Sequence, residues 1–186
     1  ITCRDWSSDV CSSDLPNGVR RYHLSMANLD DTNRKILELL QNDCSITNQE
    51  LAARVGLSPA TTLERVKKLE QSGVIKRYVA LVDEKKLDKH IKVYVYITMK
   101  DHSDRSLTEF NRRIQDFPEV LECSRLAGEK DYLLKVVVDN IEDYEIFTRT
   151  RLSTLPGIDK TSSSIVLASI VERTDIVLNG GSESGQ

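Results

Sequence analysis

The chain has 186 residues, of which 39% are hydrophobic and 30% are charged, and its formal net charge at pH 7 is −3. These proportions are close to those of globular proteins and exclude a chain that is disordered throughout. The length fits one medium-sized domain or two small ones. No run approaches the roughly 18 apolar residues of a membrane span, so we expect a soluble protein without a membrane partner.

The cysteines predict neither a metal site nor a cofactor. They form no C-x-x-C pair, and no histidine follows them at the spacing of a zinc ligand. These residues are Cys3, Cys11, Cys44 and Cys123. We expect reduced thiols, as in a cytoplasmic protein, and surface positions for His23, His90 and His102.

Residues 1–27 differ from the rest of the chain. Residues 4–15 are rich in Ser and Asp, show neither helical nor strand periodicity, and lack the apolar core of a signal peptide. The string resembles a translated sequencing-adapter fragment, and Met26 has the character of a natural start. We therefore expect residues 1–27 to be a disordered, non-native tail; the alternative is a flexible arm that contacts DNA through Arg20 and Arg21.

Residues 28–78 are predicted to form a domain of three short helices. Asp30 or Asp31 can cap the first helix. Thr47 and Glu50 have the spacing of a capping box at the start of the second helix, and Gly56 follows where a left-handed residue would end it. The expected buried side chains are Ile36, Leu37, Leu40, Leu51, Ala52 and Val55.

The third helix begins with a cap at Ser58 and with Pro59 at its first position, where a missing amide hydrogen costs nothing. Leu63, Val66 and Leu69 form its predicted buried stripe. A cap, a glycine turn and a second cap in this order favour a (winged) helix-turn-helix over a generic helical bundle.

The outer face of the third helix is the candidate DNA-binding surface. Between Arg65 and Arg77 five residues are basic and one, Glu70, is acidic. Small and hydroxyl side chains at the helix start can approach base edges, while basic side chains suit guanine or phosphate. The predicted DNA-binding residues are Asn48, Ser58, Pro59, Thr61, Thr62, Glu64, Arg65, Lys67 and Lys68.

Residues 79–90 are predicted to be a strand and a charged linker, and residues 91–172 a second domain. Its elements run strand, helix, strand, strand, helix, strand (91–99, 107–117, 120–126, 132–138, 141–155 and 158–171). This βαββαβ order predicts a ferredoxin-like domain and makes the protein α+β. We expect the apolar strand 75–82 to pair across a dimer and residues 173–186 to be a flexible tail.

Segments in both predicted domains resemble the leucine-responsive/AsnC (Lrp/AsnC) family of transcriptional regulators. The matching segments are 29–37, 48–52, 54–59 and 64–70 in the first domain, and 121–123, Gly128, 131–134 and 155–157 in the second. The resemblance implies a sequence-specific regulator that binds a pseudo-palindromic operator in double-stranded DNA. It also implies homodimers that assemble further, often to octamers, and a RAM/AsnC-type domain that binds an amino-acid effector between dimers.

The resemblance places the effector near the loop formed by Gly128, Glu129, Lys130, Asp131 and Tyr132. Gly128 permits close backbone approach, Asp131 can receive an α-ammonium group, and Lys130 or backbone amides can hold a carboxylate. The alternative is a plain hairpin turn without a ligand. Two departures from the family pattern, Glu129 after Gly128 and Thr61-Thr62 in the third helix, leave effector and operator sequence unassigned.

Two other functions compete with the regulator hypothesis. An enzyme would need a nucleophile or an acid–base pair in a pocket, and the sequence contains neither a phosphate loop nor a metal cluster. A ligand-binding or scaffolding module would have a DNA-binding surface that no longer functions. The regulator hypothesis places the protein in the cytoplasm on the nucleoid; target genes and the sign of regulation stay open.

Overall fold

The computed structural model describes residues 29–178 and divides the chain into two compact units. Of the described residues, 29–80 and 172–178 form the N-terminal unit, and Leu81–Val171 form the C-terminal unit. The predicted tail 1–27, including its arm alternative, lies outside the described residues. Within residues 29–178 no helix is long and apolar enough to cross a membrane.

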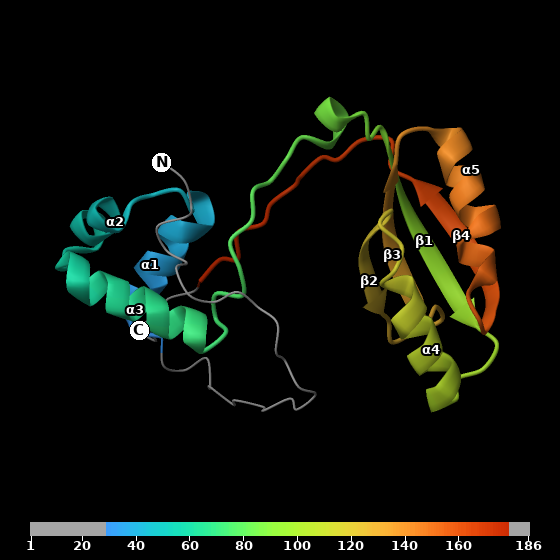
Figure 1. Ribbon diagram of the computed structural model, residues 1–186, viewed down its shortest axis with the longest axis horizontal. Helices are drawn as coiled ribbons and strands as arrows, with labels where there is room; N and C mark the ends of the chain where they lie inside the picture. The colour runs from blue at the N-terminus through green and yellow to red at the C-terminus, as the bar shows by residue number, and fades with distance from the viewer. Residues whose placement is uncertain (1–28, 179–186) are drawn as a thin grey trace, which may run out of the picture. The chain divides into compact units, whose positions relative to one another are not determined.

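The N-terminal unit contains the three predicted helices, α1 (Asp31–Asn42), α2 (Asn48–Val55) and α3 (Pro59–Gln71) (Figure 1). Asp30 caps α1 by accepting a hydrogen bond from the Asn33 amide at 2.7 Å. The capping box between Thr47 and Glu50 is present in both directions. Gly56 ends α2 with φ of 71°, in the left-handed region that costs glycine little. Local capping chemistry therefore determines where these helices begin and end.

The core of this unit corrects the predicted face of α3. Its buried residues are Ile36, Leu37, Ile46, Leu51, Val66 and Leu69. Thr62 is fully buried and Leu63 only half-buried, so the buried stripe is Thr62, Val66 and Leu69. The spacing of four and three residues follows the 3.6-residue period better than the predicted spacing of three and three. The Thr62 hydroxyl is satisfied by donating to the Ser58 carbonyl at 3.0 Å.

The chain returns to the N-terminal unit near its C-terminus. The Gln41 side chain accepts from the Ile176 amide at 2.7 Å and donates to the Ile176 carbonyl at 3.1 Å. Leu178 packs against the hydrophobic core of the unit. Residues up to Leu178 thus make defined contacts where a flexible tail was predicted, while residues 179–186 lie outside the described part.

The predicted strand 75–82 forms no strand within the described chain. After α3, Ile75 packs on the core, and the chain continues without regular structure to a short 3-10 helix at Glu84–Leu87. Val79, Leu81 and Val82 expose 52%, 72% and 63% of their surface, respectively. The apolar side chains that suggested a strand are therefore largely exposed to solvent in a single copy of the chain.

The C-terminal unit is the predicted ferredoxin-like domain. Its elements are β1 (Ile91–Met99), α4 (Asp104–Ile114), β2 (Val120–Arg125), β3 (Tyr132–Val138), α5 (Ile141–Thr150) and β4 (Ile158–Ile165) (Figure 1). The strands form one antiparallel sheet in the order β2-β3-β1-β4. The last strand ends at Ile165 rather than at residue 171, because only residues up to Ile165 lie opposite β1.

Both helices cover the same face of this sheet. Alternate residues of β1 and β3 are buried and pack against apolar residues of α4 and α5 in a single core. Phe110 lies against Tyr132 with their ring centroids 4.5 Å apart, and Phe117 meets Phe147 edge to face at 6.1 Å. The other side of β1 carries Tyr94 and Tyr96, which are exposed or half-buried. Neither helix of the C-terminal unit, as far as the structure describes it, covers this second face of the sheet.

Candidate nucleic-acid interface

The surface of α3 is polar and partly basic. Five of the predicted DNA-binding residues are exposed on this helix: Pro59, Thr61, Glu64, Lys67 and Lys68. Lys68 and Glu64 form an ion pair at 2.7 Å that is about 70% exposed on both sides. This pair lowers the pKa of Glu64, chiefly through the hydrogen bond from Lys68. Charge at Lys68 is therefore partly neutralised in the free protein.

Unpaired cations lie on and just after α3. Lys67, Lys76 and Arg77 are exposed and form no ion pair with other residues of the described chain. A basic side chain without an acidic partner can contact a phosphate without first breaking an internal ion pair. These three residues are therefore the strongest candidates for phosphate contacts.

Two predicted contact residues are placed differently from the expectation. Thr62 is buried, which is incompatible with the outward position predicted for it. Arg65 donates to Asp30 at 2.6 Å and to Asn33 at 3.0 Å, so its guanidinium joins α3 to the start of α1. The hydrogen bond from Arg65 is also the main cause of the lowered pKa of Asp30. In the free protein Arg65 therefore has a structural role.

The remaining predicted residues shape the turn between α2 and α3. The Asn48 side chain donates to the Pro59 carbonyl at 2.9 Å. Ser58 accepts from the Thr61 amide at 3.2 Å, and the hydroxyls of Ser58 and Thr61 lie 2.9 Å apart. The bond from Asn48 connects the N-termini of α2 and α3 and so contributes to the orientation in which α3 is presented, whereas the Ser58–Thr61 bonds cap α3 itself.

The candidate effector loop lies between β2 and β3. Gly128 has φ of 154°, at the edge of the region that favours glycine. Asp131 accepts from the Met99 amide at 2.7 Å, and its other carboxylate oxygen lies 2.8 Å from the His102 ring. The bond from Met99 is the main reason why the pKa of Asp131 is lowered. Asp131 therefore keeps its charge and also ties the loop to the end of β1.

Some of the side chains around Asp131 lie at the surface, and one lies in the hydrophobic core. Glu129 and Lys130 pair at 2.9 Å at the surface. Tyr132 is 1% exposed and belongs to the core, so the prediction of a ligand contact does not fit its side chain. His102, which is 59% exposed beside Asp131, was not among the residues predicted for the effector site. The two residues are 29 positions apart, and only the pairing of β1 with β3 brings them together.

Both units match known protein families. Residues 29–76 match the family model described as winged helix-turn-helix DNA-binding, and residues 92–176 match the Lrp/AsnC ligand binding domain. Among curated proteins, the transcriptional regulator AzlB of Bacillus subtilis is 38% identical over 75% of this chain and 89% of that protein. The leucine-responsive regulatory protein of Escherichia coli K12 is 37% identical over 81% of this chain and 92% of its own length.

Solved structures agree with these matches. A transcriptional regulator from Neisseria meningitidis, solved as a complex with L-methionine, superposes with a TM-score of 0.77 at 33% identity. The match covers 81% of this chain and 97% of that one. An AsnC family regulator from Agrobacterium tumefaciens has a TM-score of 0.76 at 37% identity, covering 80% and 97% of the two chains.

A helix-turn-helix unit followed by a ferredoxin-like unit with a ligand-binding match defines a DNA-binding transcriptional regulator with an effector-binding domain. The chain belongs to the Lrp/AsnC family. The predicted fold class and family are confirmed.

Proposed function

We propose that this regulator binds pseudo-palindromic operator DNA through the exposed face of α3, as the sequence analysis predicted for a symmetric dimer. Thr61 and Glu64 face the base edges. Lys67, Lys76 and Arg77 contact phosphates, and Lys68 does so once its ion pair with Glu64 opens. The observation that carries the proposal is the presence of exposed, unpaired cations on and after a capped recognition helix. The relatives named above are transcriptional regulators, which favours this function over an enzyme or a scaffold. Such a protein acts in the cytoplasm, on the nucleoid.

A gel-shift experiment tests this function. The full-length protein should retard the fragment upstream of its own gene more strongly than a coding fragment of equal length. The double variant Lys67→Ala/Lys68→Ala should weaken binding, whereas Lys160→Ala, an exposed lysine at β4, should not. Equal retardation of both fragments by the wild type would contradict sequence-specific binding.

The proposed effector is an amino acid bound at the loop 128–131. A carboxylate offers about four lone-pair positions. Asp131 uses one for the Met99 amide and one for His102, so it can still accept from an α-ammonium group. Lys130 or exposed backbone amides would hold the ligand carboxylate. The Neisseria regulator of similar structure was solved with L-methionine, which supports a ligand of this class.

A thermal-shift screen of the twenty amino acids tests the effector site. A ligand that binds only the folded protein raises the melting temperature by mass action. Asp131→Asn should reduce this rise, because it removes the charge that receives the ammonium group. Asp159→Asn, on exposed β4, is the matched control and should respond like the wild type. A screen without any shift would refute the amino-acid effector.

The proposed assembly is a homodimer that associates further, to an octamer as the family resemblance implies. Two segments with exposed apolar side chains support this assembly, because a second copy of the chain would bury these side chains. They are residues 79–82 and the segment after β4, where Leu167, Ile170 and Val171 expose 97%, 89% and 70% of their surface. Light scattering at micromolar concentration should give at least a dimer; a stable monomer would contradict this assembly.

A further inference from the structure

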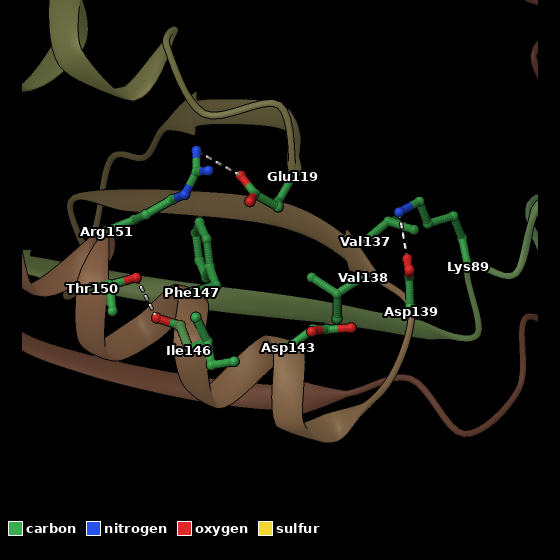
Figure 2. A pocket seen from close by; sticks show the side chains of 10 residues that line it. All are labelled: Lys89, Glu119, Val137, Val138, Asp139, Asp143, Ile146, Phe147, Thr150 and Arg151. Atoms are coloured by element: carbon green, nitrogen blue, oxygen red, sulfur yellow. Dashed lines mark hydrogen bonds and ion pairs between the residues drawn. The ribbon is translucent and has the colours of Figure 1, made fainter.

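A pocket of about 320 Å³ opens between α5 and the end of β3 (Figure 2). Its volume is at the lower end of the range for small-ligand sites. Val138 and Phe147 are buried, and Ile146, which is 47% exposed, completes an apolar surface. β3 rises about 3.3 Å per residue and runs from Tyr132 to Val138. The pocket is therefore about 20 Å from the loop 128–131 and is separate from the proposed effector site.

Charged side chains surround this apolar surface. Lys89 pairs with Asp139 on one side, and Arg151 lies 3.4 Å from Glu119 on the other (Figure 2). The fifth charged residue, Asp143, has no side-chain hydrogen bond or ion pair with the described part of the chain. The pocket thus contains three carboxylates and two cations, and the uncompensated charge is negative.

We infer that this pocket binds a small organic ammonium compound with an apolar body. Asp143 would receive the ammonium group, since it is the lining carboxylate that makes no ion pair within residues 29–178; Lys89 acts on it only through a longer-range charge interaction. The carbon chain would lie against Val138, Ile146 and Phe147 and remove apolar surface from water. A simple anion is disfavoured, because both cations already have carboxylate partners.

Three probes with the same number of carbon atoms compare the effect of charge: n-pentylamine, its neutral isostere 1-pentanol, and pentanoate. Titrations of full-length protein with labelled isoleucine and valine methyl groups would give the dissociation constants by NMR. Pentylamine should shift the methyl signals of Ile146 and Val138. It should bind at least about threefold more tightly than pentanol, as expected for a partly exposed ion pair, and pentanoate should bind most weakly.

Two variants on one helix turn complete the test. Asp143→Asn removes the charge at nearly constant volume. It should lower the affinity for pentylamine to the affinity for pentanol. Glu142→Gln removes a neighbouring exposed charge in the same first turn of α5 and should leave affinity unchanged. Equal affinities for amine and alcohol, an unaffected Asp143→Asn variant, or no methyl shifts because a second copy covers the pocket would each overturn the inference.

Discussion

Replacing Arg65 by Gln should destabilise the N-terminal unit. The substitution removes the ion pair with Asp30 at 2.6 Å and the hydrogen bond to Asn33 at 3.0 Å. The side chains of Arg65 and Asp30 are 32% and 50% exposed, so solvent screens the pair. A partly exposed ion pair and a neutral hydrogen bond together are worth about 1 kcal/mol. We therefore expect a loss of about 1 kcal/mol in the free energy of unfolding of this unit.

Hydrogen exchange of amides in α1 and α3 of the full-length protein is the appropriate assay, because it reports on one unit of a two-unit chain. Lys68→Ala, whose side chain is 71% exposed, is the matched control and should change stability by less than about 0.5 kcal/mol. Combining Arg65→Gln with Asp30→Asn, which keeps a capping oxygen, should show coupling of about 0.5 kcal/mol.

The pH dependence of stability provides a further test of the ion pair between Arg65 and Asp30. Arg65 lowers the pKa of Asp30 below its ordinary value of 3.8. The contribution of the pair is therefore fully present above that value and is lost as the pH falls through the lowered pKa. The part of the Arg65→Gln penalty that comes from the ion pair should disappear under the same conditions, and the part that comes from the hydrogen bond to Asn33 should remain. Unchanged stability at neutral pH, together with a large loss of DNA affinity, would refute the structural role of Arg65.

Three further substitutions or modifications probe single positions. Gly56→Ala should cost about 1 kcal/mol or more in thermal unfolding, because its φ of 71° disfavours any side chain; an unchanged melting temperature would argue against the left-handed turn. Thr62→Val should leave DNA affinity within about twofold, because Thr62 is buried and the Ser58 carbonyl still accepts from the residue 62 amide; a large loss would place Thr62 at the DNA. Cys123 is exposed, but partial desolvation of its thiol and the nearby Glu122 charge raise the thiol pKa to about 11, so its alkylation, followed by peptide mass spectrometry, should accelerate up to that pH; a plateau near pH 9 would contradict this environment.

The parts of the fold that depend on neighbouring residues could be predicted from the sequence. The capping box at Thr47 and Glu50 and the glycine that ends α2 were predictable, because each acts over three or four residues. The strand β3 was predicted with its observed limits, since charged and glycine-containing segments flank its apolar run. The sheet order followed from the βαββαβ sequence of elements.

The errors arose at positions whose structure depends on residues far away in the sequence. On α3 Thr62 occupies the buried position that was predicted for Leu63, whereas Val66 and Leu69 are buried as predicted. The ion pair of Arg65 was not predicted, because its partner Asp30 is 35 positions away. The end of the last strand depends on how far β1 extends opposite it. His102 has no sequence signal that connects it to Asp131. Spatial neighbours of this kind become visible only once the chain is folded.

The salt dependence of DNA binding by the Lys67→Ala variant tests the central claim most directly. Fluorescence anisotropy with any labelled duplex suffices, because phosphate contacts do not depend on sequence. If the exposed face of α3 contacts DNA, the slope of log affinity against log salt concentration should become shallower by about 0.9. Lys160→Ala should keep the slope of the wild type. Identical affinities and slopes for all three proteins would contradict the placement of DNA on α3.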